Sequence, residues 1–436
     1  MRYDFETWMD RSHSGSVKWE LAYRSGRTLP EGIVPFSVAD MEFKNPPEVT
    51  AAMKDYLDHC IPGYTEPTDS YWKSVTEWMR KHHHWEVSKE EIVTTPSVVC
   101  ALGFGVQAFT EPGDKVLIMT PVYMPFYRVI RQNGRIIEES PLILTEDGRY
   151  HIDFEDLRRR AMDPAVKLLI LCSPHNPVGR VFEWEELERI GEICLEAGIY
   201  IISDEIHFDL IMPGYQHTVL ASLSDALNDI TMTCTSPSKT FNLAGMQLSN
   251  IVIHNPAMRK RFRDVAARQN ITSSNALSYV ACEAAYTQGG EWLEELLQIL
   301  DKNRQIVEDY IDSNMPLVKV TPLEGTYLLW LDFRKVCGDK KRLEETMQEK
   351  GLFMDEGYLF GKAGEGFERM MLACPAQVIR KALPLMKQVY DQLLEEGIRG
   401  DADGTGTLGA SDAVQGTGSA DVCAGMCRCR RSGRIL

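Results

Sequence analysis

The chain has 436 residues, of which 44% are hydrophobic and 25% are charged, a balance typical of soluble globular proteins. This length is enough for two or three domains with a large core. The formal net charge of −16 argues against nucleic acid or an anionic membrane as a main partner.

The chain start and the cysteines bear on location. Residues 1–7 lack the basic segment followed by an apolar segment that marks a secretory signal. No run of 18 or more apolar residues predicts a membrane span. The eleven cysteines are scattered, mostly in apolar contexts, which favours free thiols over a disulfide framework. We therefore expect a cytoplasmic protein.

The first part of the chain is expected to hold an irregular arm followed by helices. Residues 1–48 are rich in turn formers, whereas 49–59 and 71–85 have helical patterns. The second helix ends in His82, His83 and His84. Consecutive histidines on a helix point about 100° apart and cannot converge on one metal ion. We therefore expect a solvated helix end and no metal site.

Strands and helices alternate through the middle of the chain. The predicted strands are 92–97, 115–119, 167–172, 199–203, 230–234 and 250–253. Such alternation predicts an α/β fold with a mostly parallel sheet and helices on both faces. Helices over 256–268, 275–287 and 291–314 follow. The predicted elements of the C-terminal part are strands 318–320, 326–331 and 369–373 and helices 341–350 and 377–396.

These elements suggest a division into domains. Residues 1–48 form an arm that joins a small domain, 49–288 form the large domain, and 289–398 form the rest of the small α+β domain. From 399 to 436 the sequence is dominated by glycine, alanine, serine, threonine and aspartate, which predicts a low-complexity, disordered tail.

Polar residues follow three of the predicted strands. Asn176 comes after 167–172, Asp204 ends the strand that begins at 199, and Lys239 comes after 230–234. Ligands bind at the carboxyl ends of strands in open α/β folds. A lysine amine forms a Schiff base with an aldehyde, and pyridoxal 5′-phosphate (PLP) is the common aldehyde cofactor held this way.

The other residues at these strand ends match the remaining parts of PLP. Asp204 supplies a carboxylate for the ring nitrogen, Asn176 a polar group for the ring hydroxyl, and Ser236 and Ser238 hydroxyls for the phosphate. The turn before Val98 offers the amides of a helix N-terminus, which also suits a phosphate, although an ordinary helix start has the same pattern.

Three stretches of the sequence resemble a known family. SPHNPVGRVF, SDEIHFDL and SPSKTFNLAG are similar to fold-type I PLP enzymes of the class I/II aminotransferase superfamily. More narrowly, they resemble the MalY/PatB group of cystathionine β-lyases, which are cysteine-S-conjugate β-lyases. The resemblance extends over residues 1–396 and includes PFSVADMEFKNPPEV, IPGYTEP, EGTYLLWLDFR and LFGKAGEGFERMMLACP.

The resemblance implies roles for individual residues near the cofactor. Lys239 would hold PLP and act as general base, and Tyr123 would stack on the ring. The backbone of Val98 and Val99 would meet the phosphate. His207 would either approach the ring or pack behind it.

Further roles implied by the resemblance concern the substrate and a second subunit. Arg369 would bind the substrate carboxylate through its guanidinium fork. Ala39 and Asp40 would lie near the substrate. Tyr64 would reach the PLP phosphate of a neighbouring subunit, which implies a homodimer with shared sites.

The implied activity is carbon–sulfur β-lysis of a small sulfur-containing amino acid, such as cystathionine, to thiol, pyruvate and ammonia. Transamination uses the same residues and stays open. A regulatory partner of a transcription factor is a further alternative, because relatives of the group bind a transcription regulator in some bacteria. An NAD enzyme is disfavoured, because Gly103-Phe104-Gly105 lies within a predicted helix without a third glycine in register.

Overall fold

The computed structural model describes residues 1–402, and for 399–402 the backbone alone. Met1–Leu394 form one compact unit, and a second unit begins at Glu395. The domain boundaries predicted after residues 48 and 288 stay predictions.

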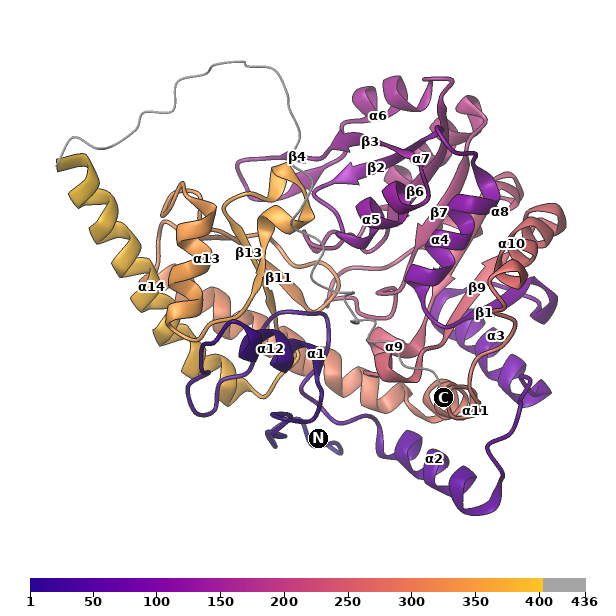
Figure 1. Cartoon of the computed structure of the whole chain (residues 1–436), viewed down its shortest axis with the longest axis horizontal. Coiled ribbons are helices and arrows are strands. Elements are labelled where there is room, and N and C mark those ends of the chain that lie inside the picture. Colours follow the sequence, from indigo (N-terminus) through magenta and orange to yellow (C-terminus); the bar gives the residue numbers. More distant parts are fainter. Residues whose placement is uncertain (403–436) are drawn as a thin grey trace, which may run out of the picture. The chain divides into compact units, whose positions relative to one another are not determined.

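A seven-stranded sheet forms the centre of the first unit (Figure 1). Its strand order is β1-β9-β8-β7-β6-β2-β3, and only β9 runs antiparallel to its neighbours. In this order the bounds are Ile92–Thr95, Ser249–Ile253, Thr231–Thr235, Tyr200–Asp204, Val166–Cys172, Lys115–Thr120 and Ile136–Pro141. The predicted mostly parallel α/β sheet is confirmed.

Helices cover both faces of this sheet because successive strand residues point to opposite sides. Leu168 and Ile170 of β6 belong to one apolar core and Leu169 and Leu171 to another. The first core includes residues of α4 (Val98–Phe109), α5 (Pro125–Gln132) and α10 (Pro256–Arg268). The second includes residues of α6 (Phe154–Ala161), α7 (Trp184–Ala197) and α8 (Asp225–Ile230).

Gly105 shows how closely α4 approaches the sheet. A Cβ atom at this position would lie 2.6 Å from Ile202 Cδ1 and 2.8 Å from Met232 Cε. The glycine that weakly resembles a dinucleotide-binding signature is therefore required for packing of a helix on strands β7 and β8.

A smaller antiparallel sheet lies in the C-terminal part, with strand order β10-β11-β13-β12. The bounds in this order are Lys319–Val320, Leu328–Asp332, Phe367–Met371 and Asp355–Glu356. Helices α13 (Lys340–Glu349) and α14 (Ala376–Ala402) contribute residues to the apolar core beside it. The helix predicted over 377–396 thus runs to Ala402, and the rest of the predicted tail, 403–436, lies outside the described residues.

Helix α12 (Gly290–Asn314) connects the two halves of the unit, as its predicted length indicated. Its Asn303 is fully buried and donates from Nδ2 to the carbonyls of Leu372 (2.9 Å) and Cys374 (2.8 Å) at the end of β13. Nearby, α2 (Pro47–His59) and α3 (Asp69–His83) pack on α11 (Ala276–Gln288). The remaining short elements are β4 (Ile143–Leu144), β5 (Tyr150–His151), α9 (Pro237–Thr240), and the 3-10 helices 89–91, 220–222, 244–246, 357–360 and 362–364.

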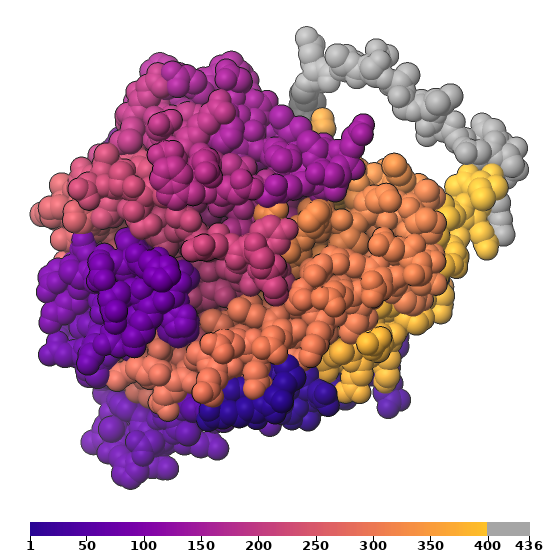
Figure 2. Space-filling view, turned by 180° about the vertical axis from the view of Figure 1, so that it is seen from behind, coloured from indigo at the N-terminus to yellow at the C-terminus, as the bar shows by residue number. Residues whose placement is uncertain are grey.

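The N-terminal arm contains a helix that the sequence analysis did not expect, α1 (Val17–Arg24). Its buried face includes a lysine, so its apolar pattern is hidden. Lys18 Nζ is fully buried, pairs with Glu42 at 2.5 Å and donates to the Asp40 carbonyl at 2.7 Å. Figure 2 shows the start of the chain, in indigo, against orange C-terminal residues, where Tyr3 N–H donates to Glu295 of α12.

The end of α3 also differs from the prediction of a solvated histidine run. His83 is buried, its Nε2 lies 2.7 Å from Asp209 Oδ1, and its ring stacks on Phe208. Within residues 1–402 we find no cluster of three or more His, Cys, Asp or Glu arranged to hold a metal ion. None of the helices in the described part has the length and apolar character that a membrane crossing requires.

Candidate active site

A cavity of about 280 Å³ lies at the carboxyl ends of β6, β7 and β8. It includes all but two of the residues singled out in the sequence. Those that line it are Ala39, Val98, Val99, Tyr123, Asn176, Asp204, His207, Ser236, Ser238, Lys239 and Arg369. The structure therefore brings these residues together, and the roles assigned to them stay predictions.

Lys239 stands on the short helix α9, which begins where β8 ends. Ser236 caps this helix, and its Oγ accepts a hydrogen bond from Ser238 N–H at 3.1 Å. The Lys239 amine donates to the Ala39 carbonyl at 2.6 Å. Loss of water around the amine lowers the pKa of Lys239 to about 8, although nearby Asp40 and Asp204 act in the opposite direction. A useful fraction of the amine is therefore neutral near physiological pH, as a nucleophile or base requires.

Asp204 ends β7 and is 2% exposed. Its cross-strand neighbours are the thiol residues Cys172 and Cys234. One carboxylate oxygen accepts a hydrogen bond from Ile206 N–H at 3.3 Å. Burial raises the pKa of Asp204 to about 7, and the positive charge of Lys239 only partly offsets this rise. The site therefore holds a carboxylate suited to a cationic or N–H-bearing ligand.

Arg369 projects from β13 and is 3% exposed. Its Nη1 donates to Asn176 Oδ1 at 2.7 Å, and its Nη2 pairs with Asp355. Its Nε is buried and has no acceptor among the described residues. A buried donor without an acceptor is costly unless a ligand completes it, and a carboxylate is the natural acceptor for a guanidinium.

The opposite side of the cavity offers donors for an anion. Ser97 caps α4 by accepting a hydrogen bond from Cys100 N–H at 3.1 Å. The amides of Val98 and Val99 precede Cys100 in the first turn, where N–H groups have no partner within the helix. Ser236 and Ser238, whose Oγ atoms are 2.9 Å apart, line the same cavity. Together these groups fit a phosphate.

Two ring side chains complete the walls. Tyr123 lies just after β2, and burial raises its pKa to about 12, so it carries a neutral phenol. His207 is 3% exposed, and burial moves its pKa well below its usual value. A neutral imidazole with a buried Nδ1 that has no partner in the described chain faces the same space.

Asp40 and Tyr64 do not line the cavity. Asp40 pairs with Arg11 at 2.7 Å and influences the Lys239 amine from behind Ala39. Tyr64 lies in the loop between α2 and α3 and is fully exposed. Its predicted role concerns a neighbouring subunit and cannot be met within one chain.

The sequence analysis missed two residues of the cavity wall, Val38 and Asp355. Val38 has φ of 60°, an unusual conformation for a β-branched residue, and its N–H donates to Asp355 Oδ2 at 2.9 Å. Asp355 follows the apolar run 352–354, so the strand-end pattern that identified Asp204 could have indicated it.

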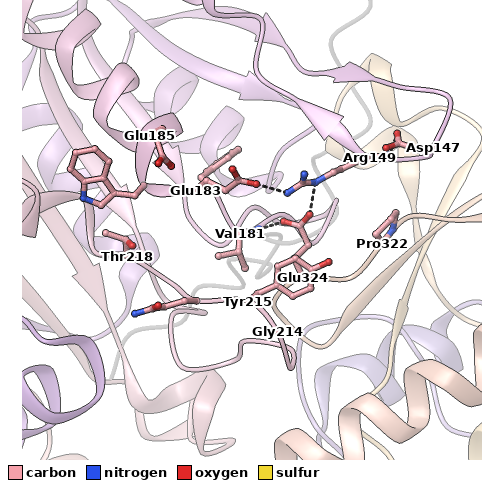
Figure 3. A pocket seen from close by; sticks show the side chains of 13 residues that line it. Asp147, Arg149, Val181, Glu183, Glu185, Gly214, Tyr215, Thr218, Pro322 and Glu324 are labelled. Carbon is pink, nitrogen blue, oxygen red and sulfur yellow. Dashed lines mark hydrogen bonds and ion pairs between the residues drawn. The ribbon is translucent and has the colours of Figure 1, made fainter.

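A second hollow, of about 610 Å³, contains none of the predicted site residues. Figure 3 shows Arg149 between Glu183 and Glu324, to which it donates at 3.0 and 2.7 Å. Because these charged groups already pair with one another, we place the active site in the smaller cavity.

Fold and site together define the protein class. The chain belongs to the class I and II aminotransferase family, whose family model matches residues 31–384. It is similar to the cystathionine β-lyase PatB of Bacillus subtilis, with 42% identity over 386 residues, which are 88% of this chain and 99% of that protein.

Two solved structures share the fold. Cystalysin from Treponema denticola, which contains a pyridoxal 5′-phosphate cofactor, has a TM-score of 0.88 and 46% identity, and covers 90% of this chain and 100% of its own. The PLP-bound C-S lyase from Staphylococcus hominis, complexed with L-cycloserine, has a TM-score of 0.83 and 31% identity, covering 89% and 98%.

The raised pKa of Asp204 predicts how the stability of the cofactor-free protein depends on pH. A carboxyl group with a pKa of about 7 when folded and about 4 when unfolded contributes stability below pH 4, which is lost as the pH rises through 7. Asp204→Asn removes this loss. Urea denaturation should therefore show the variant gaining roughly 2–3 kcal/mol relative to wild type between pH 5 and pH 7.5.

The exposed Asp312 provides a matched control, and Asp312→Asn should follow the wild-type pH dependence. An equal pH dependence in wild type and Asp204→Asn would contradict the assignment of a buried, high-pKa carboxyl at position 204.

Proposed function

We propose that the protein is a PLP-dependent carbon–sulfur β-lyase that cleaves cystathionine or related cysteine S-conjugates to thiol, pyruvate and ammonia. The observation that carries this proposal is the convergence of Lys239, Asp204 and Arg369 on one cavity. The similarity to PatB and to two PLP-containing C-S lyase structures supports the same function.

The residues of the cavity fit each part of PLP. Asp204 offers a buried carboxylate to the ring nitrogen, and the first amides of α4 with Ser236 and Ser238 offer donors to the phosphate. Tyr123 lines the wall where a ring would lie, and Asn176 offers an amide to the ring hydroxyl. When bound, PLP supplies an aldehyde that reacts with amines and a ring that draws electrons from the substrate Cα.

The chain's own groups account for the remaining steps. The unused Nε–H of Arg369 binds the substrate carboxylate and so orients the amino acid. Asp204 holds a proton on the ring nitrogen, because a buried carboxylate is stabilised by a facing positive charge. Lys239, with a pKa of about 8, accepts the Cα proton near neutral pH. Loss of the Cβ–S bond then releases the thiol.

Transamination is the second candidate, and membership of the aminotransferase family favours it. Both reactions begin with removal of the Cα proton by the same lysine. They differ in whether charge at Cα expels the sulfur from Cβ or the proton returns to the cofactor. The position of the lyase relatives makes the first outcome our proposal.

We also propose a homodimer located in the cytoplasm. Leu57, Ile61 and Tyr64 are exposed at the end of α2 and in the following loop, as expected for a surface that a second copy covers. The buried Cys172, Cys194, Cys234, Cys282 and Cys374 carry free thiols, which fits a reducing compartment.

The lyase proposal predicts catalytic release of pyruvate and thiol from cystathionine or an S-alkyl cysteine without any added keto acid. Lys239→Ala should lower this rate by about 10² to 10⁴-fold, because it removes the general base. A coupled pyruvate assay measures the rate. Lys260→Ala, which changes an exposed lysine on α10, serves as the control. Turnover that requires 2-oxoglutarate would instead identify an aminotransferase.

The shared-site proposal predicts that Tyr64→Phe weakens PLP binding by about tenfold or more, the effect of losing a hydrogen bond to a charged phosphate. Equilibrium dialysis measures the affinity, and Tyr215→Phe changes another exposed tyrosine as the control. Mixed dimers of Lys239→Ala and Tyr64→Phe chains should regain activity, since one of their two sites is intact. Unchanged PLP affinity would remove Tyr64 from the site.

A further inference from the structure

Asp355 is the one acidic residue of the cavity wall besides Asp204, and no role has been assigned to it above. It lies on β12 directly opposite Arg369 on β13, so the two form a cross-strand pair. Asp355 Oδ2 accepts from Arg369 Nη2 and from the Val38 N–H, which lies 2.9 Å away. The carboxylate is therefore fixed by the sheet, by the arginine and by the N-terminal arm.

The pair changes what Arg369 presents to a ligand. Two of the five guanidinium N–H donors are used by Asn176 and Asp355, while the buried Nε–H has no acceptor in the described chain. Since Asp355 already balances the charge of Arg369, a substrate carboxylate gains hydrogen bonds and little net charge attraction. One carboxylate fits this arrangement well.

A second carboxylate would meet different conditions. The charged side chains lining the cavity are Lys239, Arg369, Asp204 and Asp355, and His207 is neutral. In the proposed function Lys239 is engaged with PLP and Asp204 with the ring nitrogen, and the phosphate adds negative charge. A negatively charged substrate side chain would then find Asp355 and no unpaired cation among the lining residues of this chain.

We propose that Asp355 is a specificity-determining residue that makes the site select amino acids whose side chains carry no net negative charge. S-alkyl cysteines have neutral side chains, and the far end of cystathionine is zwitterionic, so both are accepted. Dicarboxylic amino acids and their keto acids are rejected. This inference rests on the proposed function and deepens it, because it also disfavours 2-oxoglutarate as an amino-group acceptor.

Calorimetric binding of butyrate and succinate to the PLP-loaded protein tests this inference without any turnover. The two ligands have four carbons each, lack an amine, and differ in one terminal carboxylate. Wild type should bind butyrate at least about tenfold more tightly than succinate, as repulsion between nearby buried charges predicts. In Asp355→Asn the ratio should fall to within about threefold.

Two further variants make the result specific. Glu356→Gln changes the neighbouring carboxyl on β12, which does not line the cavity, and should keep the wild-type ratio. Asp355→Ser removes the charge and keeps an acceptor for Val38 N–H, so it should act like Asp355→Asn if that variant does not retain PLP. Equal affinities in wild type, or an unchanged ratio in both Asp355 variants, would overturn the proposal.

These measurements separate the two proposals. If no thiol is released but the butyrate preference depends on Asp355, the lyase assignment fails and the selectivity stands. If thiol is released but the preference is absent, the selectivity fails and the lyase assignment stands.

Discussion

The active site depends on a carboxylate held where it has little solvent and no direct ion pair. Asp204 is 2% exposed, and the Lys239 amine donates to Ala39 instead of pairing with it. Burial of an ionised group is costly, so the fold itself favours a ligand that brings positive charge or an N–H group to this position. The parallel sheet maintains this arrangement, because Asp204 is fixed between β6 and β8.

The N-terminal arm closes the cavity from the other side. The buried pair of Lys18 and Glu42 anchors residues 39–42, and the Ala39 carbonyl meets the Lys239 amine. Val38, strained at φ of 60°, is tied to Asp355 on the small sheet. A buried ion pair gives little net stability compared with apolar packing. Its value here lies in the position it gives the arm beside the substrate.

Much of the fold and of the site followed from local sequence patterns. Strand ends carrying Asn176, Asp204 and Lys239 are recognisable because apolar strands and polar turns alternate, and the carboxyl ends of parallel strands meet at one edge. The helix α1 was not recognisable, because its buried face includes Lys18, whose partner Glu42 lies 24 positions away. Polar burial that depends on a distant partner leaves no periodic signal.

Asp355 and Tyr64 show two further limits of sequence reasoning. The pairing of Asp355 with Arg369 arises from the register of β12 against β13, which no spacing in the sequence reveals. Tyr64 is exposed in the single chain, so its role depends on a second copy. The resemblance to PLP enzymes indicated Tyr64, whereas only the structure indicated Asp355.

The central claim is that the amine of Lys239 carries the aldehyde cofactor. Borohydride reduction of the PLP-loaded protein, followed by proteolysis and mass spectrometry, tests it most directly. The account predicts a pyridoxyl-phosphate mass increment on the peptide that contains Lys239, and no such increment in Lys239→Arg. A modification found instead on other lysines, or an unmodified Lys239 peptide from a protein that retains PLP, would contradict the account.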